Sequence, residues 1–327
     1  MTHVTPIRGS AGAVTVRVPA KVNLQLSVGP PRPDGYHGLV TVFHAVSLFD
    51  EVTVSEADRT SVSVSGEGGP AVPLGPANLA VRAAAALARA TGRRGRGGAG
   101  VRIEIRKRIP VAAGLAGGSA DAAAALVACN ELWNAGIGPD ELSEIGAQIG
   151  SDVPFALLGG TAVGLGRGER LTRALVSGSY HWVLAFGASG LSTPDVYATC
   201  DRLRAARRPA DGDEPEPLPE PELNTALMAA LRSGDPAAVG PLLSNDLQPA
   251  ALSLQPLLRR ALAAGREHGA LGALVSGSGP TCAFLAADAD AASELAVGVT
   301  GAGVCRAVVQ VTGPAPGASV VSAGATA

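Results

Sequence analysis

Apolar and polar residues alternate along much of the N-terminal part of the chain, and a period of two residues is typical of β-strands. This pattern predicts strands at 14–18, 22–28, 39–48, 51–55 and 61–65. Pro33-Asp34-Gly35 is a turn signal between the second and third of these strands. The beginning of the chain is therefore expected to form a mixed sheet.

One face of the second strand carries polar side chains. Lys21, Asn23 and Gln25 alternate with apolar residues, so they must project to the same side and put an ammonium group beside an amide. Lys21 and Lys107 are the only lysines among the 26 basic residues. A compact ammonium meets phosphate oxygens differently from a planar guanidinium, so these lysines mark candidate phosphate positions. An arginine-rich codon usage that left two lysines by chance is the alternative.

Helix signals follow the strands. Asn78 precedes an alanine-rich run that continues to residue 90, so it is a candidate N-cap. A new alternation predicts a strand at 101–107, and a helix is predicted from 119 to about 133. Pro139 suits the first turn of another helix, which Gly150 would close.

Composition narrows the function classes. With 327 residues, of which 46% are apolar, the chain can bury a large core and favours two domains over one. A formal net charge of -2 provides no basic field for a nucleic-acid backbone or an anionic membrane. No stretch reaches the roughly 18 apolar residues of a membrane-spanning helix, so a cytoplasmic location is expected. Four cysteines without paired spacing suggest neither a disulfide framework nor a zinc site.

Two segments are poor in core-forming residues. Residues 201–222 combine mixed charge with five prolines and few large apolar side chains, which predicts a mobile surface loop. The tail from Gly313 is rich in small residues and is expected to fray.

The sharpest motif is the glycine-rich stretch at 110–125, between a predicted strand and a predicted helix. Backbone N–H groups at the start of a helix bind anions, helped by a helix dipole worth about 0.3–1 kcal/mol. Gly114, Gly117 and Gly118 permit close approach and positive φ, so successive N–H groups can converge on a phosphate. The stretch lacks the lysine of a Walker P-loop and the spacing of a dinucleotide fingerprint. A flexible connector into an alanine-rich helix is the alternative.

Several motifs together resemble one enzyme superfamily. GLAGGSADAAA at 114–124 resembles the second signature motif of the galactokinase, homoserine kinase, mevalonate kinase and phosphomevalonate kinase superfamily. The segment at 19–52 resembles the first motif in the form used by the diphosphocytidyl-methylerythritol kinase branch, and 273–285 resembles the third motif. IGSDVPF, STPDVY and NDLQPA also match that branch. The matches run in the expected order from Ala20 to Leu285.

The resemblance implies a catalytic pair, Lys21 and Asp152. Asp152 would accept the proton of the substrate hydroxyl, while Lys21 would orient that carboxylate and offset charge on the transferred phosphoryl group. A helix cap is the alternative for an aspartate before Val-Pro. The resemblance also implies that Mg²⁺ accompanies ATP and that Asn78, Lys107 and a phosphate loop bind the nucleotide. The loop residues are Pro110, Val111, Ala112, Ala113, Gly114, Leu115, Ala116, Gly117, Gly118, Ser119 and Ala120, with Ser119 capping the next helix.

Other matches imply the acceptor site. Asn23, Tyr36 and His37 match the cytidine end of the substrate site, where Tyr36 offers a stacking face and His37 a hydrogen-bonding edge. Packing at a hairpin end is the alternative for this Tyr-His pair. Thr193 matches a substrate-contacting threonine. The third motif would close over the phosphates, form a tight turn, or do both, and it contains Ser276, Gly277, Ser278 and Gly279.

The resemblance implies an α+β fold with two domains and a site in the cleft between them. Residues 1–170 would form an N-terminal kinase domain with a mixed sheet, and 171–327 a ferredoxin-like domain. The implied activity is phosphorylation of the 2-hydroxyl of 4-diphosphocytidyl-2-C-methyl-D-erythritol by ATP, a step toward isoprenoid precursors, in a monomer or weak homodimer. Homoserine or mevalonate kinase would not account for the DGYH segment, and a non-catalytic sensor would not account for Lys21 and Asp152.

One position departs from the family pattern. Ala116 stands where many members have glycine. Because an alanine with positive φ would be strained by about 1–2 kcal/mol, we expect an ordinary backbone conformation at this residue.

Overall fold

The computed structural model describes residues 12–93, 100–206 and 219–321. One set of strands is β1 (Val14–Pro31), β2 (His37–Glu56), β3 (Ser61–Gly66), β4 (Val101–Lys107), β5 (Thr161–Gly166), β6 (Arg170–Arg173), β8 (Ser244–Asn245) and β12 (Ser319–Val320). The other set is β7 (Tyr180–Phe186), β9 (Gly272–Val275), β10 (Cys282–Ala286) and β11 (Ala307–Gly313). The α-helices are α1 (Leu79–Ala90), α2 (Gly117–Leu132), α3 (Pro139–Ile149), α4 (Val153–Leu158), α5 (Thr193–Ala206), α6 (Thr225–Ser233), α7 (Pro236–Val239), α8 (Gln248–Leu254), α9 (Leu257–Glu267) and α10 (Ala289–Gly301).

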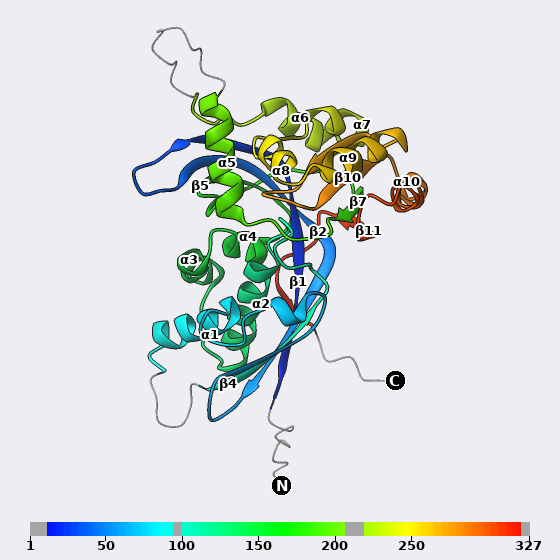
Figure 1. Ribbon diagram of the computed structural model, residues 1–327. Helices are drawn as coiled ribbons and strands as arrows, with labels where there is room; N and C mark the ends of the chain where they lie inside the picture. The colour runs from blue at the N-terminus through cyan, green and yellow to red at the C-terminus, as the bar shows by residue number, and fades with distance from the viewer. Residues whose placement is uncertain (1–11, 94–99, 207–218, 322–327) are drawn as a thin grey trace, which may run out of the picture.

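Within these residues the strands form two sheets, and helices pack against both (Figure 1). The larger sheet has the order β12-β1-β2-β4-β3, with β5 attached to β2, β6 to β5 and β8 to β1. It is mixed, because β3 pairs parallel to β4 and β8 parallel to β1, whereas β1 and β2 are antiparallel. The α+β class and the mixed N-terminal sheet expected from the sequence are confirmed.

The β1–β2 hairpin extends through both halves of the molecule (Figure 1). The sequence predicts each of these strands as two shorter ones. The structure joins them, because register shifts at Pro19/Ala20 and between Asn23 and Gln25 absorb the interruptions of the alternation. One continuous hairpin thus belongs to the N-terminal core and to the region near the C-terminal sheet.

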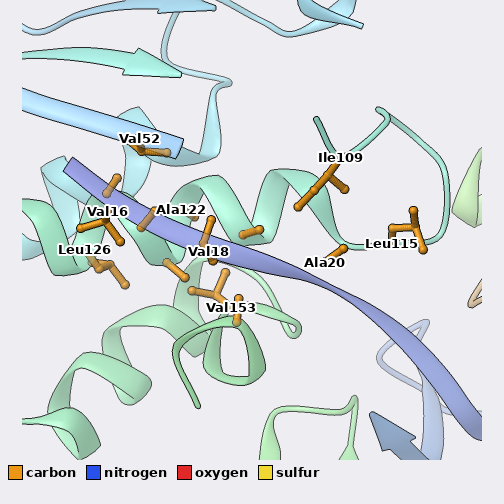
Figure 2. Packing of buried hydrophobic residues seen from close by; sticks show 14 of the residues in the cluster. Val16, Val18, Ala20, Val52, Ile109, Leu115, Ala122, Leu126 and Val153 are labelled. Atoms are coloured by element: carbon orange, nitrogen blue, oxygen red, sulfur yellow. The ribbon is translucent and has the colours of Figure 1, made fainter. Parts of the chain in front are cut away.

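Helix α2, most of whose buried residues are alanines, packs along β1 (Figure 2). Val16 and Val18 of β1 lie against the part of α2 that carries Ala122 and Leu126, and all four side chains are fully buried. An alanine-rich helix can approach a strand closely, and burial on many sides explains why α2 shows no apolar stripe. The same core receives Val153 from the start of α4.

The other N-terminal helices follow their sequence signals. The Asn78 side chain caps α1 as predicted, because its Oδ1 accepts the N–H groups of Ala80 at 2.9 Å and Val81 at 3.4 Å. Helix α3 begins at Pro139 and ends before Gly150. No helix in the described ranges is long and apolar enough to span a bilayer.

The smaller sheet is antiparallel and has the order β11-β7-β10-β9. Numbered along the chain, its strands follow the order 4-1-3-2 of a ferredoxin-like sheet, as expected. The chain also returns to the larger sheet, since β8 and β12 both pair with β1. The domain boundary predicted after residue 170 falls at the start of β6. This boundary stays a prediction.

Two expectations about flexible segments are wrong for the residues that the structure describes. Residues 201–206 are the last turns of α5, and 207–218 lie outside the described residues. Glu222 packs on β1, because its carbonyl accepts the Gln25 side-chain N–H at 2.7 Å. The tail from Gly313 to residue 321 is also held, since Ala315 is buried and Ser319–Val320 forms β12, and residues 322–327 lie outside the described residues.

The expectation for Ala116 is wrong as well. Its backbone lies in the left-handed region, with φ 59° and ψ 30°, at the N-cap position of α2. Helix α2 therefore begins at Gly117, and Ser119 lies inside its first turn and does not cap it. The tight entry from the glycine-rich loop into the helix forces this conformation, which costs an alanine about 1–2 kcal/mol.

We expect Ala116→Gly to increase the free energy of unfolding by up to about 1 kcal/mol. The relief of strain exceeds the entropy of about 0.5–1 kcal/mol that glycine loses on folding. Urea denaturation measures the change. Ala113→Gly is the control, since Ala113 has no positive φ and should lose stability. A loss of stability in Ala116→Gly as large as in the control would contradict the interpretation.

Candidate active site

A cavity of about 710 Å³ lies where the β1–β2 hairpin, the glycine-rich loop, the start of α5 and the third motif meet. It brings together most of the residues that the sequence singles out. Those that line it are Lys21, Asn23, Tyr36, His37, Ala112, Ala113, Gly114, Ala116, Gly117, Gly118, Ser119, Asp152, Thr193, Gly277 and Ser278. The predicted site residues outside this lining are Asn78, Lys107, Pro110, Val111, Leu115, Ala120, Ser276 and Gly279.

Lys21 is buried and its ammonium is held in place. Its Nζ donates to Asn23 Oδ1 at 2.6 Å and to the Gly114 carbonyl at 2.9 Å. Asn23 in turn donates through Nδ2 to Thr41 Oγ1 at 2.8 Å, which orients its oxygen toward the lysine. Burial lowers the pKa of Lys21, and the negative charge of Asp152 opposes that shift. The predicted pairing of an ammonium with an amide on one strand face is confirmed.

Asp152 occupies the N-cap position of α4, but its side chain makes no capping hydrogen bond. It lines the cavity instead. Its charge acts on two neighbours: it adds to the effect of burial, which raises the pKa of Tyr197, and it opposes the effect of burial, which lowers the pKa of Lys21. The Asp152 side chain therefore does not cap the helix, and the helix-cap alternative is wrong.

The third motif fixes the glycine-rich loop. The Ser276 hydroxyl donates to the Gly114 carbonyl at 3.1 Å, and the Thr281 N–H donates to the Ala113 carbonyl at 3.3 Å. A Cβ on Gly114 would lie 2.1 Å from the Ser276 carbonyl oxygen, so only glycine fits. Gly114 also has the predicted positive φ, whereas Gly117 and Gly118 belong to α2. Loop and third motif form one structural unit beside Lys21.

Lys107 lies in a buried ion cluster behind the loop. Its Nζ donates to Asp50 Oδ2 at 2.5 Å and to Asp121 Oδ2 at 2.8 Å. Asp50 also accepts the backbone N–H groups of Arg108 and Ile109. Burial raises the pKa of Asp121 to about 8; the charge of Lys107 opposes this effect and that of Asp50 adds to it. Burial alone would lower the pKa of Lys107, but the two carboxylates raise it.

Asn78 and Lys107 thus have structural partners in the described part of the chain. Asn78 caps α1, and Lys107 bonds to Asp50 and Asp121. Their contact with a nucleotide stays a prediction. Sequence reasoning missed the roles of Asp50 and Asp121, although both lie inside motifs that it quoted. A buried lysine such as Lys107 needs a carboxylate partner. This requirement was the signal that could have pointed to Asp50 and Asp121.

The far end of the cavity is aromatic and polar. The Tyr36 side chain is half exposed, and the Arg167 guanidinium lies 5.2 Å from the centre of its ring. His37 is buried, with Nε2 3.0 Å from Asp201 Oδ1 and its ring 5.0 Å from that of Tyr197. Of these five residues, sequence reasoning singled out only Tyr36 and His37.

Thr193 lies beside the third motif. Its Oγ1 is 2.9 Å from the Ser278 hydroxyl. Thr193, Tyr197 and Asp201 are spaced by four residues on α5, so they share one face of the helix toward the cavity. This spacing was the signal for Tyr197 and Asp201. Composition instead predicted a loop at 201–222 that includes Asp201, so the helical spacing was not followed to that residue.

The comparisons with known proteins agree with this arrangement. The model of the GHMP kinases N terminal domain matches residues 78–160, and that of the GHMP kinases C terminal domain matches 227–304. A 4-diphosphocytidyl-2-C-methyl-D-erythritol kinase of Mycolicibacterium gilvum is 57% identical over 316 residues, which cover 97% of this chain and 95% of that protein. The protein of the same name from Thermobifida fusca is 56% identical over 317 residues, covering 94% and 98%.

The chain belongs to the 4-diphosphocytidyl-2-C-methyl-D-erythritol kinase family of GHMP kinases. The resemblance seen in the sequence motifs is confirmed. A crystal structure of 4-(cytidine 5'-diphospho)-2C-methyl-D-erythritol kinase is similar with a TM-score of 0.71 and 35% identity, covering 91% of this chain and 98% of that one. A homoserine kinase from Cytophaga hutchinsonii, at 17% identity and a TM-score of 0.70, covers 98% of this chain and 100% of its own and shares the GHMP kinase fold.

The ion cluster of this family member makes stability depend on pH. The pKa of Asp121 is about 8 in the folded protein and 3.8 for an ordinary aspartate. The folded state therefore holds a proton that the unfolded chain releases, so the free energy of unfolding should fall as pH rises from about 4 to about 8. Urea denaturation at about pH 5 and about pH 8 measures the free energy of unfolding at each pH. Between these two pH values, that free energy should fall less in Asp121→Asn than in the unmodified protein.

The control is Asp140→Asn, which changes an exposed aspartate in the first turn of α3. It should keep the pH dependence of the unmodified protein. An equal pH dependence in Asp121→Asn and in the unmodified protein would contradict the assignment.

Proposed function

We propose that the protein transfers the γ-phosphoryl group of ATP to the 2-hydroxyl of 4-diphosphocytidyl-2-C-methyl-D-erythritol, giving the 2-phosphate and ADP in the cytoplasmic non-mevalonate route to isoprenoid precursors. One observation carries the proposal. A single cavity joins Lys21 and Asp152, beside a glycine-rich loop, to the Tyr36–His37 pair at its other end. Such a cavity can hold ATP phosphates and a nucleotide-linked acceptor together. The identity to kinases named for this acceptor supports the same substrate.

The loop and the first turn of α2 would bind the ATP phosphates. Helix α2 begins directly after the loop, so its unpaired N–H groups and its dipole favour negative charge at the cavity. Gly117, Gly118 and Ser119 line the cavity there. The glycines keep side chains away from the backbone donors, which lets phosphate oxygens approach closely.

Lys21 and Asp152 would act on the reacting atoms. Phosphoryl transfer needs a positioned nucleophile, neutralised charge and in-line geometry, and little covalent chemistry from the protein. Asp152 accepts the proton of the acceptor hydroxyl. Lys21, whose ammonium is fixed by Asn23 and Gly114, interacts with Asp152 through its charge and offsets the charge on the transferred group.

Magnesium would enter with the nucleotide. Mg²⁺ is commonly bound through one or two protein oxygens together with substrate phosphates. No group of three or more His, Cys, Asp and Glu side chains that could hold a metal occurs in the described ranges. The Ser119 hydroxyl, which lies at the cavity, would contact the ion, and the ion supplies neutralising charge when bound.

Asp152→Asn tests the assigned base. It keeps the shape of the side chain but removes the proton-accepting charge, so kcat should fall at least about a hundredfold while ATP binding survives. A coupled ADP-release assay measures turnover, and calorimetry measures ATP binding. Asp195→Asn, which changes an exposed aspartate in the first turn of α5, is the control and should keep full activity. Near-normal turnover of Asp152→Asn would remove Asp152 from the mechanism.

The substrate is tested with a panel of acceptors. The cytidine-containing acceptor should be phosphorylated far better than methylerythritol phosphate, because loss of the nucleotide leaves polar groups of the site unpaired. Homoserine and mevalonate should not be turned over. Equal kcat/KM for the nucleotide-free compound or for either of these alcohols would overturn the named substrate and leave the family assignment standing.

A further inference from the structure

The imidazole of His37 is fixed by an aspartate of another element. His37 begins β2, and Asp201 lies in the last turns of α5. Both carboxylate oxygens of Asp201 face His37 Nε2, at 3.0 and 3.2 Å. The His37 side chain is only 7% exposed, and the Tyr197 ring packs against it. The ring therefore has little freedom to turn away from its partner.

Helix α5 is itself tied to the hairpin that carries His37. Arg204 donates to the Val28 carbonyl at 2.8 Å and pairs with Asp246 at 3.2 Å. Asp246 also accepts the Val28 N–H at 2.9 Å. These contacts lie next to Asp201 on the helix and hold α5 against β1. The distance between Asp201 and His37 is thus set by the fold as well as by their own hydrogen bond.

The contact decides which ring nitrogen carries the proton. An ionised carboxylate only accepts hydrogen bonds, so Nε2 must be the N–H donor. In a neutral imidazole the other nitrogen, Nδ1, is then an acceptor. Nδ1 has no hydrogen-bond partner among the described residues, and His37 lines the cavity. This atom is therefore left for a ligand that offers a hydrogen-bond donor.

We propose that Asp201 is a positioning residue for base selection, which fixes His37 as a hydrogen-bond acceptor and thereby favours cytosine over uracil. The inference rests on the proposed function, in which the acceptor carries cytidine. Cytosine presents an exocyclic amino group where uracil presents a carbonyl oxygen. The acceptor atom Nδ1 of His37 matches the amino group of cytosine. With uracil, Nδ1 would face a carbonyl oxygen, and two acceptors that face each other are costly in a buried site.

The test compares the cytidine acceptor with its uridine counterpart in the full-length protein and in Asp201→Asn. An amide can present either its oxygen or its NH₂ group to Nε2, so the tautomer of His37 is no longer fixed. The ratio of kcat/KM for cytidine over uridine should fall at least about tenfold, while KM for ATP stays unchanged. Asp195→Asn, the same change on the same helix, should keep the ratio of the unmodified protein.

A second measurement reports the tautomer directly. In ¹⁵N-histidine NMR of the unmodified protein, His37 should carry its proton on Nε2, and Asp201→Asn should weaken that preference. A proton on Nδ1 in the unmodified protein would overturn the proposal. An unchanged base ratio in Asp201→Asn would overturn it too, whereas failure of the unmodified protein to phosphorylate the cytidine acceptor would overturn the proposed function itself.

Discussion

The buried charge of Lys107 constrains the whole catalytic half of the molecule. A cation taken out of water must be paired, and Lys107 is paired by Asp50 of β2 and Asp121 of α2. Asp50 also binds the N–H groups of Arg108 and Ile109, which lead into the glycine-rich loop. One cluster therefore fixes the entry of the loop, the helix after it and the central sheet. The loop can be strained at Ala116 because both of its ends are held.

A single carbonyl oxygen connects this scaffold to the reacting groups. The Gly114 oxygen accepts from Lys21 Nζ and from the Ser276 hydroxyl. Lys21 belongs to the N-terminal hairpin, whereas Ser276 follows β9 of the smaller sheet. The position of the ammonium thus depends on contacts from both sheets, which is why site residues widely separated in sequence meet in one cavity.

Sequence reasoning predicted the elements well where the pattern was regular. The alternations of β1, β2 and β4 and the cap of α1 were visible in the residues, and the motifs located Lys21 and Asp152. Tertiary contacts decided the rest. The backbone of Ala116 is set by the tight entry from the loop into α2, and Asp201 is placed by α5 docking on the hairpin. Composition alone could not reveal that Glu222 packs on β1, because its hydrogen bond with Gln25 is made through the backbone carbonyl.

The pairing of β12 with β1 has a consequence for synthesis of the chain. Ser319 and Val320 pair with Arg17 and Val16, so a strand near the end of the sequence completes a sheet that starts with the first described strand. During translation this edge of β1 stays open until residues 319–320 have left the ribosome, and open strand edges invite pairing with other chains. A protein shortened before residue 319 would keep that edge exposed, so truncation should lower solubility during expression.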